Sequence, residues 1–531
     1  MSSISCSNEL SVPSLEALPQ ATLTATSEKH TYGQILKSSA LVGGSSVVNV
    51  VIGIVRTKAM AVLLGPAGFG LFGLYGSIVN LAQSIAGMGV NSSGVRQIAE
   101  AAGTGNTVRI AQTAAVLRRT CIFLGALGAG LLVVFSRQVS TLTFGNNQHA
   151  AAVCLLSIAV FFQLVSGGQG ALIQGMRRIA DLAKMGVLGA FFGALISIPV
   201  VYFLREKGVV PSLVGVAAMT IFTSWWYSRK LRTKAPSMTV SQVGQEAAAL
   251  LKLGFAFMSS GMVMMGVAYA VRIIVLRKIG FAATGFYQSA WTLGGLYVGF
   301  ILQAMGADFY PRLTASANDN TVCNRLVNEQ ARVGLLLGGP GVIATLACAP
   351  VVIALLYSAK FGAAVGILRW ICLGATLQVI TWPMGFIIVA KARSGLLVFT
   401  EVAWGVASVG LAWFCVTSFG LNGAGIAFFG SYIFHVFLIY AIVRWLSGFR
   451  WSTANKQTAL LFLPLIAVVF CGFHVLPLLW AACVGTLAVL VSTAYSIRVL
   501  SKLVPLHEIP RPVRRLLVGL RFVPSGTTGL S

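Results

Sequence analysis

The sequence predicts an all-α polytopic membrane protein with about fourteen transmembrane helices, arranged as two six-helix lobes and a C-terminal hairpin. Three observations lead to this prediction. The chain has few charged residues for its length, its apolar runs are long enough to cross a bilayer, and its two halves repeat one pattern of polar residues and glycines.

The composition excludes an ordinary soluble protein. The chain has 531 residues, of which 57% are hydrophobic and 9% are charged. A soluble domain carries roughly 25% charged residues, so much of this surface must face hydrocarbon. Segments such as Ile35–Val55, Ile179–Leu204 and Leu461–Leu479 each have the length of a bilayer-spanning helix. They show no period-two alternation, which favours helices over the strands of a membrane barrel.

Apolar segments separated by polar or glycine-rich stretches give the expected helices. In chain order, we expect spans at about 35–55, 70–95, 112–136, 149–174, 179–204, 209–228, 253–276, 285–310, 333–356, 362–390, 395–418, 422–443, 458–476 and 478–500. Residues 1–34 are Ser/Thr-rich without an apolar run, which predicts a disordered tail. Residues 501–531 are expected to form a basic tail.

The positive charge of the chain indicates its orientation in the membrane. The formal net charge is +26, from 38 Lys and Arg against 12 Asp and Glu. Most of the basic residues fall in the loops and tails on the side of the N-terminus. The positive-inside rule then places both termini in the cytoplasm. We therefore expect anionic membrane lipids as a partner of these loops and no nucleic-acid binding.

An internal repeat appears when the chain is shifted against itself by 215 or 216 positions. The aligned pairs are Arg56 with Arg272, Gly65 with Gly280, Gly70 with Gly285, Arg96 with Arg312, Gln163 with Gln378, Arg178 with Arg393, and Gly215 with Gly430. The shift spans six helices, an even number, so the two copies share one orientation about a pseudo-two-fold axis along the membrane normal. Two such lobes suit a carrier that works by alternating access, although duplication also occurs in channels.

The repeat also predicts the domain organisation. We expect an N-terminal lobe at 35–228, a basic cytoplasmic linker at 229–252, a C-terminal lobe at 253–450 and an appended helix pair at 451–500.

Charged residues inside the expected spans are candidate functional residues, because a charge at mid-bilayer costs about 2.5–3.5 kcal/mol on insertion scales. Arg56 and Lys58 follow the first span, Arg272 takes the matching place in span 7, and Arg369 lies near the start of span 10. They could pair with an anionic substrate, or they could snorkel to head groups. Asp308 and Glu401 are the acids of interest. Each could carry a proton or cation, or form a structural ion pair.

Amide side chains form the second group of candidates. Asn80 and Gln83 lie in span 2 on a stripe with Gly87 and Asn91, and span 8 carries a similar stripe of Thr292, Gly295, Gly299, Gln303 and Gly306. Gln163 and Gln378 occupy matching places in the two halves. Small-residue stripes often serve close helix packing. The amides could in addition bond the hydroxyls of a sugar in a wet cavity.

Two short motifs resemble a known family. Residues 63–74, LLGPAGFGLFGL, and residues 420–425, GLNGAG, resemble Wzx-type polysaccharide flippases, the lipid-linked oligosaccharide translocases that handle O-antigen and related units. These belong to the multidrug/oligosaccharidyl-lipid/polysaccharide exporter superfamily. The resemblance implies a MATE-like fold, although many such flippases lack the C-terminal helix pair and the polar N-terminal extension expected here.

The resemblance also implies a function and roles for the candidate residues. The substrate would be an undecaprenyl-diphosphate-linked oligosaccharide, moved to the periplasmic leaflet of the bacterial inner membrane with ion coupling. Polysaccharide polymerase machinery would be a further partner. Arg56, Lys58, Arg272 and Arg369 would then bind the diphosphate, Asn80, Gln83, Gln163 and Gln378 would contact the sugar, and Asp308 and Glu401 would couple an ion.

Two other classes of protein remain as alternatives. A cation-coupled multidrug exporter of the same superfamily should have acidic lobes, whereas bases outnumber acids here. A membrane-embedded polymerase or glycosyltransferase calls for a large outer loop or clustered acids, and the expected outer loops are short. No Walker-type phosphate loop occurs. We therefore expect no enzyme activity, no cofactor and no metal site.

Overall fold

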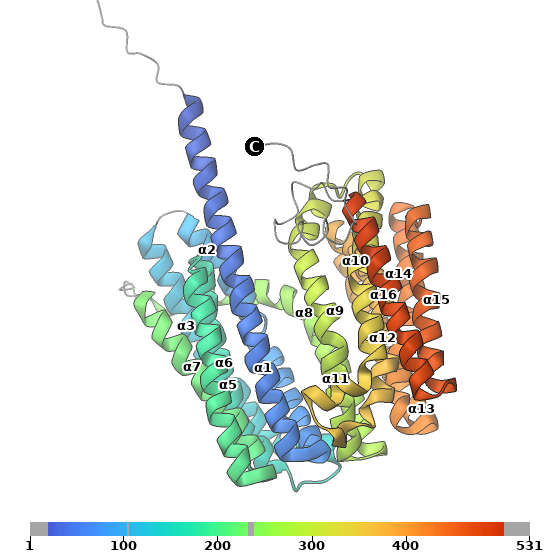
Figure 1. Ribbon diagram of the computed structural model, residues 1–531. Helices are drawn as coiled ribbons and strands as arrows, with labels where there is room; N and C mark the ends of the chain where they lie inside the picture. The colour runs from blue at the N-terminus through green and yellow to red at the C-terminus, as the bar shows by residue number, and fades with distance from the viewer. Residues whose placement is uncertain (1–19, 104–105, 232–237, 504–531) are drawn as a thin grey trace, which may run out of the picture.

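The computed structural model describes residues 20–103, 106–231 and 238–503 and is helical almost throughout (Figure 1). In the bilayer only helices and closed barrels satisfy every backbone polar group, and the apolar runs of this chain form helices. The α-helices are α1 (Gln20–Gly87), α2 (Val90–Gly103), α3 (Thr107–Val134), α4 (Ser136–Phe144), α5 (Ala150–Gly175), α6 (Ile179–Leu204), α7 (Val209–Ser228), α8 (Val240–Lys278), α9 (Phe281–Ala315), α10 (Asn320–Ala347), α11 (Ala349–Leu356), α12 (Ala364–Ala390), α13 (Ser394–Phe419), α14 (Gly423–Ser447), α15 (Thr453–Val475) and α16 (Leu478–Leu503). Short 3-10 helices are η1 (Arg205–Gly208), η2 (Arg229–Leu231), η3 (Ala359–Phe361) and η4 (Gly420–Asn422).

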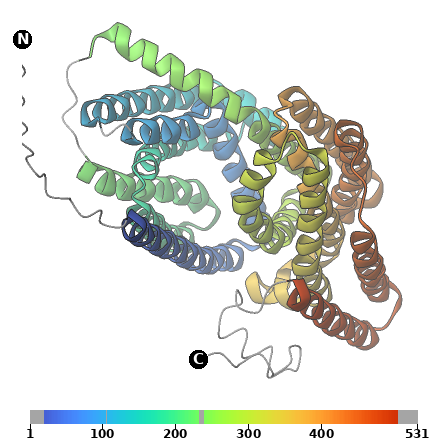
Figure 2. The same cartoon turned by 90° about the horizontal axis from the view of Figure 1, so that it is seen from above.

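The helices form two bundles that lie side by side in both views (Figures 1 and 2). We call α1–α7 the first lobe and α8–α14 the second lobe. Helices α15 and α16 pack on α10 at the edge of the second lobe. The start of α1 and the end of α16 lie at the same end of the molecule, which we call the proximal end; the opposite end is distal.

Within the described residues, nine helical stretches are long and apolar enough to cross a membrane. Three of them, with 44, 53 and 54 residues, each exceed the ~20 residues that one crossing needs. In each of the three, a residue with positive φ (Gly65, Arg205 or Gly420) reverses the chain. The chain therefore passes through the membrane many times, while the expected number of fourteen spans stays a prediction.

The backbone repeats at the same offset as the sequence. Three pairs of positive-φ residues lie 215 positions apart: Gly65 (φ 65°) with Gly280 (121°), Arg177 (54°) with Ala392 (53°), and Arg205 (52°) with Gly420 (58°). The left-handed region is unfavourable for Arg and Ala. Positive φ angles nevertheless recur at matching turns, so both halves reverse the chain in the same way. Each half accepts the backbone strain of a non-glycine residue at such a turn.

The structure corrects two of the expected boundaries. Helix α1 begins at Gln20, so residues 20–34 are helical and not a disordered tail; residues 1–19 lie outside the described part. Extending an existing helix adds one hydrogen bond per residue without a new nucleation cost. The expected linker is shortened as well, because α8 already begins at Val240, where Thr239 and Gln242 form a capping box. Residues 504–531, most of the expected basic tail, lie outside the described residues.

Candidate functional site

The two lobes meet at the distal end through glycines of α1 and α9. A Cβ on Gly70 would lie 2.8 Å from the backbone nitrogen of Gly285 and closer still to the carbonyl oxygen of Phe281. A Cβ on Gly285 would in turn lie 2.8 Å from the carbonyl carbon of Pro66. The two backbones thus cross without room for a side chain. Gly70 and Gly285 are one of the aligned pairs of the repeat, so the crossing lies where the pseudo-two-fold axis would pass.

A second backbone contact joins the lobes nearer the proximal end. Gly89, with φ 66°, packs against Gly254 of α8, and a Cβ on Gly254 would lie 2.9 Å from the carbonyl carbon of Gly89. Between the Gly70–Gly285 contact and the Gly89–Gly254 contact, the facing helices carry glycines and exposed side chains. Asn80, seven residues after Gly73 and hence on the same face of α1, is exposed, and Gly295 and Gly299 of α9 face open space.

Arg272 of α8 lies at this inter-lobe face and is only 7% exposed. Its Nε donates to Oε1 of Gln288 at 2.7 Å, and one terminal nitrogen donates to the carbonyl oxygen of Ala268 at 2.8 Å. Its guanidinium carbon is 6.0 Å from the ring centroid of Trp291. Among the described residues, no carboxylate forms an ion pair with Arg272. A buried cation is thus held by neutral groups, which leaves its charge available to an anion.

Gln288 connects Arg272 to the first lobe. Its amide nitrogen donates to the hydroxyl of Thr292 at 3.3 Å. A Cβ on Gly73 of α1 would lie 3.0 Å from Cγ and Oε1 of Gln288. The Arg272–Gln288 pair therefore rests directly on α1, one helical turn from the Gly70–Gly285 crossing.

Arg56 occupies the matching place in the first lobe. Its guanidinium carbon lies 5.7 Å from the ring centroid of Phe72 and its side chain is half-buried. Its Nε has no hydrogen-bond partner in the part of the chain that the structure describes. In the second lobe, Arg272 interacts electrostatically with Tyr287, which lies 15 positions later in the chain. Arg56 and Arg272 therefore each lie near an aromatic residue of the helix segment that follows. Lys58 is exposed.

Arg369 is placed away from Arg272. Its guanidinium carbon lies 4.0 Å from the ring centroid of Phe473 in α15, and no described residue bonds its buried Nε. Ile371, two positions later, points to the opposite face of α12 and lines a cavity inside the second lobe. Arg369 thus faces the C-terminal helix pair in this conformation, and its role in binding the diphosphate stays a prediction.

The predicted amide and acid residues are distributed over the two lobes and do not form one cluster. Gln378 lines the cavity of the second lobe, whereas half-buried Gln163 and Gln83 lie in the first lobe. Glu401 is half-buried on the face of α13 that carries Trp404 and Ser408, and it takes part in an interaction of its own. The side chain of Asp308 lies outside the part of the chain that the structure describes.

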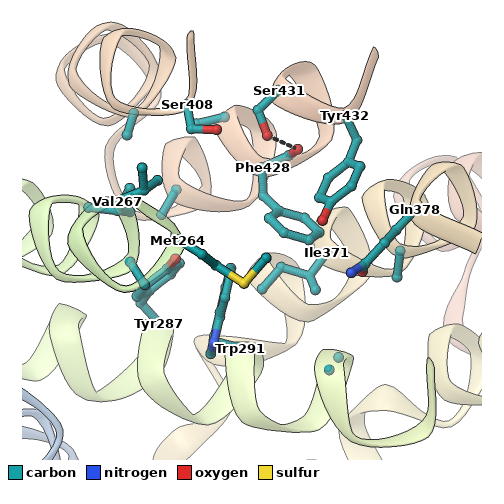
Figure 3. A pocket seen from close by; sticks show the side chains of 18 of the residues that line it. Met264, Val267, Tyr287, Trp291, Ile371, Gln378, Ser408, Phe428, Ser431 and Tyr432 are labelled. Atoms are coloured by element: carbon teal, nitrogen blue, oxygen red, sulfur yellow. Dashed lines mark hydrogen bonds between the residues drawn. The ribbon is translucent and has the colours of Figure 1, made fainter. Parts of the chain in front are cut away.

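The cavity of the second lobe has a volume of about 150 Å³ and lies among α8, α9, α12, α13 and α14 (Figure 3). Five aromatic side chains contribute to its wall: Tyr287, Trp291, Trp404, Phe428 and Tyr432. Trp291, Gly295 and Gly299 lie on the same face of α9 as Gln288, so the cavity borders the inter-lobe face.

A group of polar and aromatic contacts holds the lobes together at the distal end. Arg277 of α8 donates to the carbonyl oxygens of Thr141 and Leu142, in the last turn of α4. A cation suits the negative end of a helix. The hydroxyls of Thr143 and Tyr269 form another bond between α4 and α8. Arg277 of the second lobe thus has its partners in the first lobe.

His149 lies at the centre of this distal contact. Its ring stacks on Phe144 with centroids 4.0 Å apart, and its Nδ1 is 2.8 Å from the hydroxyl of Tyr75. Phe281 of the second lobe lies 6.0 Å from the His149 ring. Partial burial lowers the pKa of His149 below its ordinary value of 6.5.

Sequence reasoning missed Gln288 and the aromatic cavity. Gln288 lies one helical turn before Thr292 and continues the stripe of span 8, so extending that stripe by four residues finds it. The cavity residues come from five helices and share no spacing in the sequence, so only the fold brings them together.

Comparison with known proteins agrees with this geometry. The sequence profile of the polysaccharide biosynthesis protein family matches residues 59–366. The lipid III flippase of Escherichia coli (strain K12) is 22% identical over 410 residues, covering 75% of this chain and 95% of that protein. Among solved structures, the lipid II flippase MurJ in an inward closed conformation has a TM-score of 0.63 at 14% identity, covering 87% of this chain and 99% of that one. An inward-facing multidrug resistance MATE transporter has a TM-score of 0.61 at 16% identity, covering 78% and 99%.

The protein therefore has the two-lobed helical membrane fold that the MATE transporter and MurJ structures share, and the predicted MATE-like fold class is confirmed. The matched profile covers more than half of the chain. This protein belongs to the polysaccharide biosynthesis protein family.

Proposed function

We propose that the protein is a flippase that carries an undecaprenyl-diphosphate-linked oligosaccharide, an O-antigen or related repeat unit, from the cytoplasmic to the periplasmic leaflet. The observation that carries this proposal is Arg272, a buried arginine at the inter-lobe face that no described carboxylate neutralises. A diphosphate can accept charge-assisted hydrogen bonds from a guanidinium, and such bonds are strong where water is scarce. The curated relative is a lipid III flippase, which supports a lipid-linked substrate.

The two backbone contacts suggest how transport proceeds. The conformation seen here is held at the distal end by the Gly70–Gly285 crossing and by Arg277 on α4, so the distal side is closed. Opening would break these contacts while the lobes rotate as rigid bodies about Arg272, as alternating access requires. With both termini in the cytoplasm of the bacterial inner membrane, the distal end faces the periplasm. Arg56, Lys58 and Asn80 would take part in the open states, and Arg369 would be reached only through movement of α15.

Ion coupling and partners are further parts of the proposal. Glu401, on the α13 face that borders the aromatic cavity, is the described acid best placed to exchange a proton or cation during the cycle. Anionic lipids would bind the basic proximal loops. Polysaccharide polymerase machinery would receive the translocated unit on the outer side.

The test is complementation of bacterial strains that each lack one defined polysaccharide flippase, scored by the surface glycan that returns. The wild-type chain should restore one glycan, Arg272→Ala should restore none, and Arg118→Ala should behave as wild type because Arg118 is exposed on α3. All three proteins must be present in the membrane at equal amounts. Resistance to cationic drugs without any restored glycan would instead support an exporter.

A further inference from the structure

We infer that the aromatic cavity of the second lobe binds the sugar ring that is bonded directly to the diphosphate. This inference rests on the proposed function and assigns a separate subsite to the first sugar of the lipid-linked glycan.

The size of the cavity fits one six-membered ring. Its volume is about 150 Å³. A protein cavity of about that volume is known to take up one benzene molecule. A polyprenyl chain would need a long apolar groove, and a whole oligosaccharide would need several times this space. The cavity is thus suited to a single pyranose.

The chemistry of the lining fits a sugar better than an apolar ring or a cation. The C–H faces of a pyranose pack on aromatic rings. Trp291 and Phe428 offer such rings (Figure 3), and Trp404 lines the cavity as well. Sugar hydroxyls at the ring edge need polar partners, and the amide of Gln378 reaches the cavity from α12. Among the described residues that line the cavity none carries a carboxylate, and Glu401 lies on the neighbouring part of α13 outside this lining, which favours a neutral occupant in the cavity itself.

Two buried hydrogen-bond donors line the cavity, and neither donates to an acceptor among the described residues. Trp404 is 7% exposed and Ser408 is 6% exposed, yet the indole Nε1 and the hydroxyl Oγ have no hydrogen-bond partner in the described part of the chain. Both side chains line the cavity. An indole N–H can only donate, so its natural partner is an oxygen acceptor such as a sugar hydroxyl. Leaving buried polar groups unpaired is unfavourable, so a ligand that satisfies both gains affinity.

The place of the cavity beside Arg272 identifies which sugar enters it. Trp291 forms part of the wall and also lies 6.0 Å from the guanidinium carbon of Arg272. A diphosphate at Arg272 therefore has its first sugar within reach of the cavity, while the later sugars extend between the lobes. Met264, which is 50% exposed and reaches across the cavity in Figure 3, would move to admit the ring.

The test compares two probes on the full-length protein in lipid nanodiscs, a polyprenyl diphosphate bearing one sugar and the same polyprenyl diphosphate without sugar. The variant Trp404→Phe/Ser408→Ala removes the two unpaired donors and keeps most of the packing. It should weaken binding of the sugar-bearing probe roughly tenfold or more, as expected for two lost hydrogen bonds. Binding of the sugarless probe should stay unchanged.

Ser431→Ala is the matched control. Ser431 lines the same cavity, but its hydroxyl already donates to the carbonyl oxygen of Phe428 at 2.8 Å, so its loss should leave the preference for the sugar-bearing probe intact. If the double variant keeps the full preference, or if both probes weaken equally, the sugar assignment is overturned while the flippase proposal stands. If the wild-type protein binds neither probe, both proposals fail.

Discussion

Adding one methyl group at the distal crossing should force the closed side open. In Gly70→Ala the new Cβ would lie 2.8 Å from the backbone nitrogen of Gly285. To reach an ordinary contact of 3.4 Å, α1 and α9 must separate by at least about 0.6 Å. Both obstructing groups are backbone atoms, which cannot rotate away. Overpacking of this kind costs about 1–3 kcal/mol, and only the closed state has to bear it. The equilibrium should therefore shift roughly 5- to 150-fold towards distal opening.

A cysteine at Thr284 reports on this shift. Thr284 is fully buried beside the crossing, so Thr284→Cys should react with a membrane-impermeant maleimide only when the distal side opens. In a background without the native cysteines, Gly70→Ala should raise the labelling rate. Gly76→Ala on the same helix is the control, because a Cβ there meets nothing within 4 Å. Equal rates in the Gly70→Ala and Gly76→Ala proteins, with thermal unfolding unchanged in both, would refute the idea that this crossing closes the distal side.

Three further predictions concern single side chains. Arg277→Ala removes the cation from the last turn of α4 and should speed labelling of the same Thr284→Cys reporter severalfold, while Arg277→Lys should restore part of the slow rate. Because burial lowers the pKa of His149 below 6.5 in the closed state, protonation favours the open state. The labelling rate, divided at each pH by that of a permanently exposed cysteine to remove the effect of thiol ionisation, should be constant above about pH 6.5 and rise as the pH falls below it. His149→Gln should remove this rise. Gln288→Leu leaves the buried Nε of Arg272 without its acceptor and should lower the free energy of unfolding by about 1–3 kcal/mol, measured by denaturant titration in detergent; an unchanged value would show that the pair does not hold the arginine.

The sequence predicted the parts of the structure that follow from local patterns and from repetition. Apolar runs predicted the helices, since hydrocarbon leaves the backbone few other choices. The shift of 215 or 216 positions predicted Arg272 as the counterpart of Arg56 and Gly285 as that of Gly70, and the structure shows that the two glycines are in close contact. Repeat-related residues lie near a symmetry axis only if they occur on the helices that line it, as α1 and α9 do.

The sequence could not predict the direction in which a side chain inside a span points. Arg369 was chosen because it is a charge in a hydrophobic segment, but it faces Phe473 of α15 because the C-terminal helix pair packs on that side of the second lobe. Nothing in the sequence marks Trp404 or Ser408, because an aromatic residue or a serine in an apolar helix usually serves only to pack against its neighbours. Their unpaired polar atoms become visible only when five helices surround them.

Transbilayer movement in liposomes that contain only the purified protein tests the central claim most directly. The measured quantity is the rate at which a polyprenyl-diphosphate-linked glycan becomes accessible to an enzyme or reagent on the opposite side. We predict rapid movement with the wild-type protein, slower movement of the monophosphate-linked glycan, and no movement above the protein-free background with Arg272→Gln. Wild-type liposomes that behave like protein-free ones, or an Arg272→Gln protein as fast as wild type, would contradict the account.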